Sequence, residues 1–136
     1  MDSAGLALLA LVVATAVHAG FQLTVTTVVY PALARVDTDR WSTAHDAHSR
    51  SIVPVVAVTY LSLAGACLWA VLAVPSSAWV WTAGAGVTTA LVAAPTHGAL
   101  ARGRRPDLVH RLLIADRVRA LGAVIALLAA VAAAVG

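Results

Sequence analysis

Apolar residues fill four long stretches of the chain, and the polar residues gather between them. The stretches cover about residues 5–33, 52–73, 79–101 and 108–135. A bilayer core of about 30 Å is crossed by roughly 20 apolar residues in an α-helix, so each stretch is long enough to span it. The pattern predicts an all-α integral membrane protein with a single transmembrane domain over residues 1–136.

The connections between the stretches predict the topology. Arginines gather in the first and third connections, whereas both termini and the Pro75-Ser76-Ser77 turn carry none. By the positive-inside rule, the two arginine-bearing connections face the cytoplasm and both termini lie outside. Short connections make neighbouring spans antiparallel, which gives an antiparallel four-helix bundle. The segment from Asp39 to Arg50 is expected to form a short interfacial helix or an extension of the second span.

Composition supports this class and excludes others. The chain is 61% hydrophobic and 11% charged, against about 25% charged residues in soluble proteins. Its pI near 10 is explained by arginines at the cytoplasmic membrane surface, so lipid is an expected partner and nucleic acid is not. The absence of a GxGxxG, P-loop or nucleophile-elbow motif disfavours nucleotide-dependent and serine-hydrolase chemistry. A lone cysteine, Cys67, excludes an internal disulfide.

Polar side chains inside the predicted spans fall at two depths. With a rise of about 1.5 Å per residue, one set lies deep in the membrane and the other near its cytoplasmic boundary. The deep set is His18, Gln22, His97, Asp116 and Arg119, and the shallow set is Tyr30, His45, His48 and His110. Because polar groups in hydrocarbon are costly and usually functional, both sets are candidate site residues, although His110 is expected to be a surface residue.

Helical phase predicts which side chains face the inside of the bundle. In the first span, one face carries Thr15, His18, Gln22 and Thr26. Thr24 and Thr27 point away and are expected to bond to their own backbone carbonyls. In the second span, Thr59 lies on a face of small and hydroxylated residues. In the fourth span, the face of Asp116 and Arg119 is predicted to point into the bundle, and His110 and Arg117 lie on another face. His18, Gln22 and Thr59 are therefore predicted to line a substrate cavity.

Two candidate groups have alternative interpretations. His45 and His48 lie on neighbouring helical turns, a spacing able to hold a metal ion to which His97 or His110 would add a third ligand. They could equally be solvated interfacial histidines, and His97 could hydrogen-bond to a neighbouring helix. Asp116 and Arg119, three residues apart, either form an ion pair that fixes the packing of the bundle or take part in proton transfer or anion binding.

The short motifs of the chain resemble those of a known group. They are Tyr30-Pro31-Ala32-Leu33, the pair His45 and His48, Pro95-Thr96-His97-Gly98-Ala99-Leu100, and Arg111-Leu112 with Arg119. This succession resembles small four-span bacterial membrane proteins of uncharacterised function, in which Asn stands where this chain has Asp116. More remotely, the layout is similar to anthrone-oxygenase-like proteins and to four-helix haem-binding protoporphyrinogen oxidases. The resemblance implies a histidine-lined bundle in the bacterial cytoplasmic membrane that acts on a hydrophobic substrate with a metal or haem.

The leading functional expectation is a membrane-embedded oxidoreductase or oxygenase. In it, His45, His48 and His97 bind copper, iron or haem, Tyr30 supplies a proton, and Asp116 and Arg119 orient substrate or move protons. One alternative is a metal-independent acid–base enzyme, such as an isomerase or cyclase, with a lipid-like substrate. Another is a non-enzymatic carrier or accessory protein. The glycine- and alanine-rich helix faces also allow a homo-oligomer.

Overall fold

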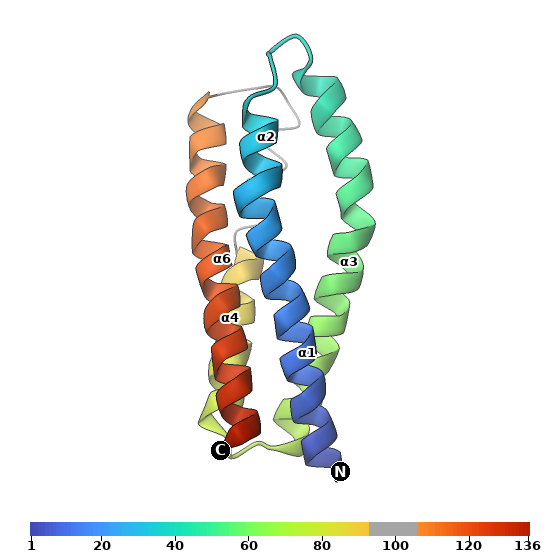
Figure 1. The fold of residues 1–136 in the computed structure, drawn as a ribbon, viewed down its shortest axis with the longest axis vertical. Coiled ribbons are helices and arrows are strands. Elements are labelled where there is room, and N and C mark those ends of the chain that lie inside the picture. The colour runs from blue at the N-terminus through green and yellow to red at the C-terminus, as the bar shows by residue number, and fades with distance from the viewer. Residues whose placement is uncertain (93–105) are drawn as a thin grey trace.

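The computed structural model describes the backbone of residues 1–92 and 106–136, and the side chains of residues 1–87 and 110–136. Within these ranges the chain is helical and contains no strand, which confirms the predicted all-α class. The elements are α1 (Ser3–Thr24), η1 (Val25–Val29), α2 (Tyr30–Ala34), α3 (Trp41–Ala73), α4 (Ala78–Val92) and α6 (Pro106–Val135). The helices lie side by side in one elongated bundle, with both chain ends at the same end of it (Figure 1).

Three continuous helices are long and apolar enough to cross a membrane: Ser3–Ala34, Trp41–Ala73 and His110–Val135. They correspond to three of the four predicted spans and favour a multi-pass membrane protein. The predicted span 79–101 begins in α4, whose 15 described residues cover about 22 Å. The remainder of that span, with His97, lies outside the described residues.

The prediction of a separate interfacial helix between the first two spans is wrong, and the alternative of an extended second span is correct. Helix α3 runs unbroken for 33 residues from Trp41 to Ala73, a length of about 50 Å. It exceeds the bilayer core by about 20 Å, so a straight continuation carries its first turns beyond the hydrocarbon. Pro54 lies inside α3 and costs one backbone hydrogen bond without ending the helix.

The first long helix contains a π-helical turn just before its proline. In η1 the backbone N–H of Tyr30 donates to the carbonyl of Val25, five residues earlier. A proline ring clashes with the carbonyl four residues before it in a regular α-helix, and a wider turn relieves that clash. Pro31 therefore does not end the helix at Tyr30; the helix continues to Ala34.

Helix α6 packs against both α1 and α4 through small residues. Its buried face includes Ala123, Ala126 and Ala130, each 0% exposed. The two helices approach closely at Gly86 of α4, where an added Cβ would lie 2.9 Å from the carbonyl oxygen of Gly122 and 3.0 Å from Cβ of Ala126. Small residues at such crossings let helix backbones approach closely in a membrane.

Substituting Gly86 with alanine is expected to lower the free energy of unfolding by about 1 to 3 kcal/mol, because α4 and α6 must move apart. Gly84→Ala is the matched control, since nothing lies within 4 Å of its added Cβ. That variant should be neutral or slightly stabilising, as alanine favours helix over glycine. Thermal unfolding of both variants in the same detergent tests the prediction, and equal midpoints would contradict it.

Candidate functional site

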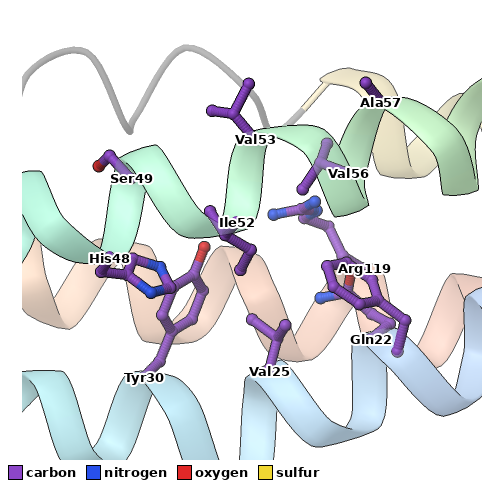
Figure 2. Close-up of a pocket in the computed structure, with 11 residues that line it drawn as sticks. Gln22, Val25, Tyr30, His48, Ser49, Ile52, Val53, Val56, Ala57 and Arg119 are labelled. Carbon is purple, nitrogen blue, oxygen red and sulfur yellow. The ribbon is translucent and has the colours of Figure 1, made fainter.

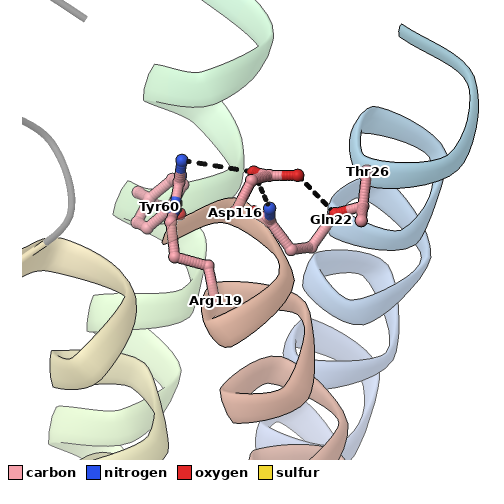
Figure 3. A network of polar contacts seen from close by, with 5 residues as sticks. All are labelled: Gln22, Thr26, Tyr60, Asp116 and Arg119. Atoms are coloured by element: carbon pink, nitrogen blue, oxygen red, sulfur yellow. Dashed lines mark hydrogen bonds and ion pairs between the residues drawn. The ribbon is translucent and has the colours of Figure 1, made fainter. Parts of the chain in front are cut away.

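Asp116 is the centre of a polar network inside the bundle (Figure 3). Its side chain accepts a hydrogen bond of 2.6 Å from Nε2 of Gln22 and one of 2.5 Å from Oγ1 of Thr26. Oδ1 of Asp116 also lies 3.6 Å from Nη1 of Arg119. Both carboxylate oxygens therefore have donors, which offsets the cost of burying a residue that is 1% exposed.

Arg119 extends the network to α3. Its Nη2 donates a hydrogen bond of 2.9 Å to the hydroxyl of Tyr60. The predicted pairing of Asp116 with Arg119 is thus confirmed, and the pair joins α6 to α1 through Gln22 and to α3 through Tyr60. Sequence reasoning missed Tyr60, although a tyrosine within an apolar span is a signal for a buried hydroxyl that needs a partner.

The predicted helical phases are confirmed in both α1 and α6. Thr15, His18 and Gln22 are fully buried, while Thr24 and Thr27 donate to the carbonyls of Gly20 and Leu23 in their own helix. In α6, His110 and Arg117 are exposed on the face opposite the buried Asp116. Periodicity alone located these inward faces because α1 and α6 are regular helices at these positions.

His18 lies deep in the bundle, next to the network. Its ring packs edge-on against the ring of Tyr60, with centroids 5.1 Å apart. Neither ring nitrogen of His18 has a hydrogen-bond partner among the described residues, and the same holds for Oε1 of Gln22. A neutral imidazole carries one donor and one acceptor, so His18 keeps hydrogen-bonding capacity that the described side chains do not use.

A pocket of about 400 Å³ adjoins the network between α1, η1, α2 and α3 (Figure 2). Its wall is mostly apolar, with polar side chains at intervals. The residues that line it are Phe21, Gln22, Val25, Tyr30, His48, Ser49, Ile52, Val53, Val56, Ala57 and Arg119. The pocket therefore brings residues of the deep and the shallow predicted sets into one site.

Tyr30 and His48 meet on the wall of this pocket. Their ring centroids are 6.3 Å apart in an edge-on arrangement, and Tyr30 also interacts with Arg119. Tyr30 is 4% exposed. Nε2 of His48 is buried and has no hydrogen-bond partner among the described residues.

The π-turn explains why Tyr30 joins the deep residues. In a regular α-helix, Tyr30 would point about 80° away from Gln22, eight residues earlier. A π-turn holds one extra residue, which reduces that angle to about 20°. Tyr30 and Gln22 consequently line the same pocket, which periodicity alone did not predict.

The predicted metal ligands His45 and His48 have different neighbours in the structure. His45 stacks on Trp41, with ring centroids 5.7 Å apart, and is not among the described residues of the pocket wall, whereas His48 lines it. The third predicted ligand, His97, lies outside the described residues. Among the residues that are described, no three His, Cys, Asp or Glu side chains form a metal-binding group. The three-histidine centre therefore stays a prediction.

Thr59, a predicted substrate-binding residue, is buried but lines a second groove between α1 and α3, with Val13, Val17 and Leu61. It is not among the described residues that line the pocket of Tyr30 and Arg119. The structure thus brings together Tyr30, Gln22, His48 and Arg119, with Asp116 and His18 adjoining, and places His45 and Thr59 apart from them.

These features define a helical protein with at least three candidate membrane-spanning helices and a buried polar network beside an apolar pocket. No family model, curated protein or solved structure matches the chain at a significant level.

Proposed function

We propose that the protein is a membrane-embedded enzyme that binds a hydrophobic small molecule and transforms it by acid–base catalysis. The observation that carries the proposal is the wall of one apolar pocket, which holds three side chains able to donate or exchange protons. These are Tyr30, His48 and Arg119. A largely apolar pocket with a few convergent polar groups is the usual form of a small-molecule site.

Each polar side chain has a role that its contacts support. His48 carries a buried nitrogen with no hydrogen-bond partner among the described residues, so it is suited to act as general base. Tyr30, next to it, supplies or returns a proton. Arg119 binds an oxygen of the substrate, and Asp116 positions Arg119 without touching the substrate. Isomerisation and cyclisation of a lipid-like compound are reactions of this class.

The membrane places the site where such a substrate is found. We propose a multi-pass protein of the bacterial cytoplasmic membrane, with the arginine-bearing connections in the cytoplasm and both termini outside. Tyr30 and His48 then lie near the cytoplasmic boundary, and Asp116 and Arg119 lie deeper. A hydrophobic substrate would enter from the lipid and place its polar group against these side chains.

The test is an untargeted search for chemical change. Purified protein in nanodiscs is incubated in deuterium oxide with a lipid extract of the bacterium used for expression. Mass spectrometry then detects compounds that gain deuterium or change structure. Wild type and His110→Ala, whose side chain is exposed, should alter the same compound. His48→Ala should lose about 10²- to 10⁴-fold of that activity, the usual contribution of a general base. If wild type and His48→Ala alter the same compounds to the same extent, or neither alters any, the acid–base proposal fails and a carrier function is favoured.

A metal- or haem-dependent oxidoreductase is the second candidate, and the buried, available nitrogen of His48 favours it. In this version His48 and His97 are ligands, and His45, stacked on Trp41, contributes least. Metal analysis and an absorption spectrum of protein expressed with iron, copper and haem test it. Bound metal or a Soret band that is lost in His48→Ala and kept in His45→Ala would support the candidate. A colourless, metal-free wild type would oppose it.

A further inference from the structure

The charge balance of the pocket points to the kind of molecule that it accepts. Among the described residues that line the pocket, Arg119 is the one with a permanent charge. Its guanidinium lies 3.6 Å from the Asp116 carboxylate, and the two side chains are 12% and 1% exposed. Gln22 and Thr26 donate to the same carboxylate, which favours its ionised form. The cation on the pocket wall is therefore already neutralised by a buried anion.

The hydrogen-bonding groups of Arg119 are not all used. Nη2 donates to Tyr60, and Nη1 faces Asp116. Nε is buried and has no partner among the described residues. Nη1 and Nη2 each carry a second N–H group, and Arg119 lines the pocket. Arg119 can thus offer a strong donor to a ligand oxygen without offering an uncompensated positive charge.

From this arrangement, and resting on the proposed function, we infer that the substrate is an electrically neutral hydrophobic molecule with a carbonyl or hydroxyl oxygen. A neutral oxygen accepts a hydrogen bond from Arg119 while the ion pair stays intact. A carboxylate or phosphate would have to share Arg119 with Asp116. Two like charges would then lie close together in a site of low dielectric constant, where repulsion is strong. Asp116 is accordingly a specificity-determining residue that excludes anions.

The experiment uses two photoreactive probes of equal chain length, a methyl ketone and a carboxylate, each carrying an alkyl diazirine. Protein in nanodiscs is photolysed with either probe at neutral pH, and labelled residues are mapped by peptide mass spectrometry. Labelling of the buried or half-buried pocket residues Val25, Tyr30, Ile52 and Val56 is divided by labelling of the exposed Leu121 and Leu128. This ratio corrects for the different partitioning of the two probes into the membrane.

The ketone is expected to label the wild-type pocket on the order of tenfold more than the carboxylate does, since an unpaired buried charge is costly. Asp116→Asn leaves Arg119 without its counter-ion while keeping the shape of the side chain. It should reduce the preference for the ketone by at least about tenfold, as removal of a buried charge alters electrostatic selectivity. The matched control is Asp46→Asn, whose side chain is 60% exposed, and it should leave the preference unchanged.

A preference of the wild type for the carboxylate would overturn the inference by itself, whether or not Asp116→Asn folds. An unchanged preference in folded Asp116→Asn would also overturn it. Both results would leave the proposed function standing, because the pocket would still bind a hydrophobic molecule. Labelling of lipid-exposed residues alone, by either probe, would overturn the proposed function together with this inference.

Discussion

Asp116→Ala is expected to lower the free energy of unfolding by about 3 to 5 kcal/mol, the cost of leaving a buried charge without its partner. Arg119 would keep its hydrogen bond to Tyr60 but lose the carboxylate 3.6 Å away. The donors Nε2 of Gln22 and Oγ1 of Thr26 would lose their acceptor as well. One substitution would thus remove a partner from three polar side chains of the described network.

The measurement is the thermal midpoint of wild type, Asp116→Ala and Asp116→Asn in one detergent. Asp116→Asn keeps an acceptor for Gln22, and the Thr26 hydroxyl can accept as well as donate, but Arg119 still loses its counter-ion, so the loss should be smaller than that of Asp116→Ala without vanishing. Asp46→Ala removes an exposed carboxylate and should change the midpoint little. If Asp116→Ala were as stable as Asp46→Ala, the polar network would not stabilise the bundle, contrary to what its contacts indicate.

Deleting Val28 should disconnect Tyr30 from the pocket. The deletion removes the extra residue of η1, so Tyr30 would turn by about 100° relative to Gln22. Val28 is 60% exposed, and its own side chain contributes little to the core. Tyr30 would leave the buried cluster that it forms with Val25, Trp41 and Leu112, and the protein should lose about as much stability as with Tyr30→Ala.

Cross-linking measures this rotation directly. Tyr30→Cys and His48→Cys are combined in a Cys67→Ala background, and a short bifunctional thiol reagent is added. Because the two native rings lie 6.3 Å apart, the parent should cross-link efficiently, and the version that lacks Val28 should not. Val28→Ala keeps the register and is the matched control. Equal cross-linking after the deletion would show that η1 does not set the direction of Tyr30.

Much of the architecture could be predicted from the sequence because lipid imposes simple rules on a chain. Apolar runs of sufficient length predicted the three spanning helices that the structure describes. A period of 3.6 residues predicted the inward position of His18, Gln22 and Asp116. The pairing of Asp116 with Arg119 followed from their spacing of three residues within one helix. These features are local, so neighbouring residues alone determine them.

The site itself depends on relations between helices that periodicity does not contain. Tyr60 became a partner of Arg119 because the long arginine side chain reaches from α6 to α3, where it meets a residue 59 positions away in sequence. His45 and His48 looked equivalent, yet one stacks on Trp41 and the other lines the pocket with Tyr30. The segment before the second span continued α3 rather than forming a separate helix.

The sequence by itself determined the all-α class, three candidate spans and the inward faces of α1 and α6, because hydrophobicity and helical phase are properties of short segments. Only the tertiary structure decided which polar side chains share one pocket. The deep and shallow residues were predicted as separate layers, and a single extra residue in η1 brings Tyr30 into phase with Gln22. The physical reason is that the π-turn is favoured because it relieves the clash of the Pro31 ring and because the turn packs against other helices. Neither effect changes the hydrophobic pattern of the sequence.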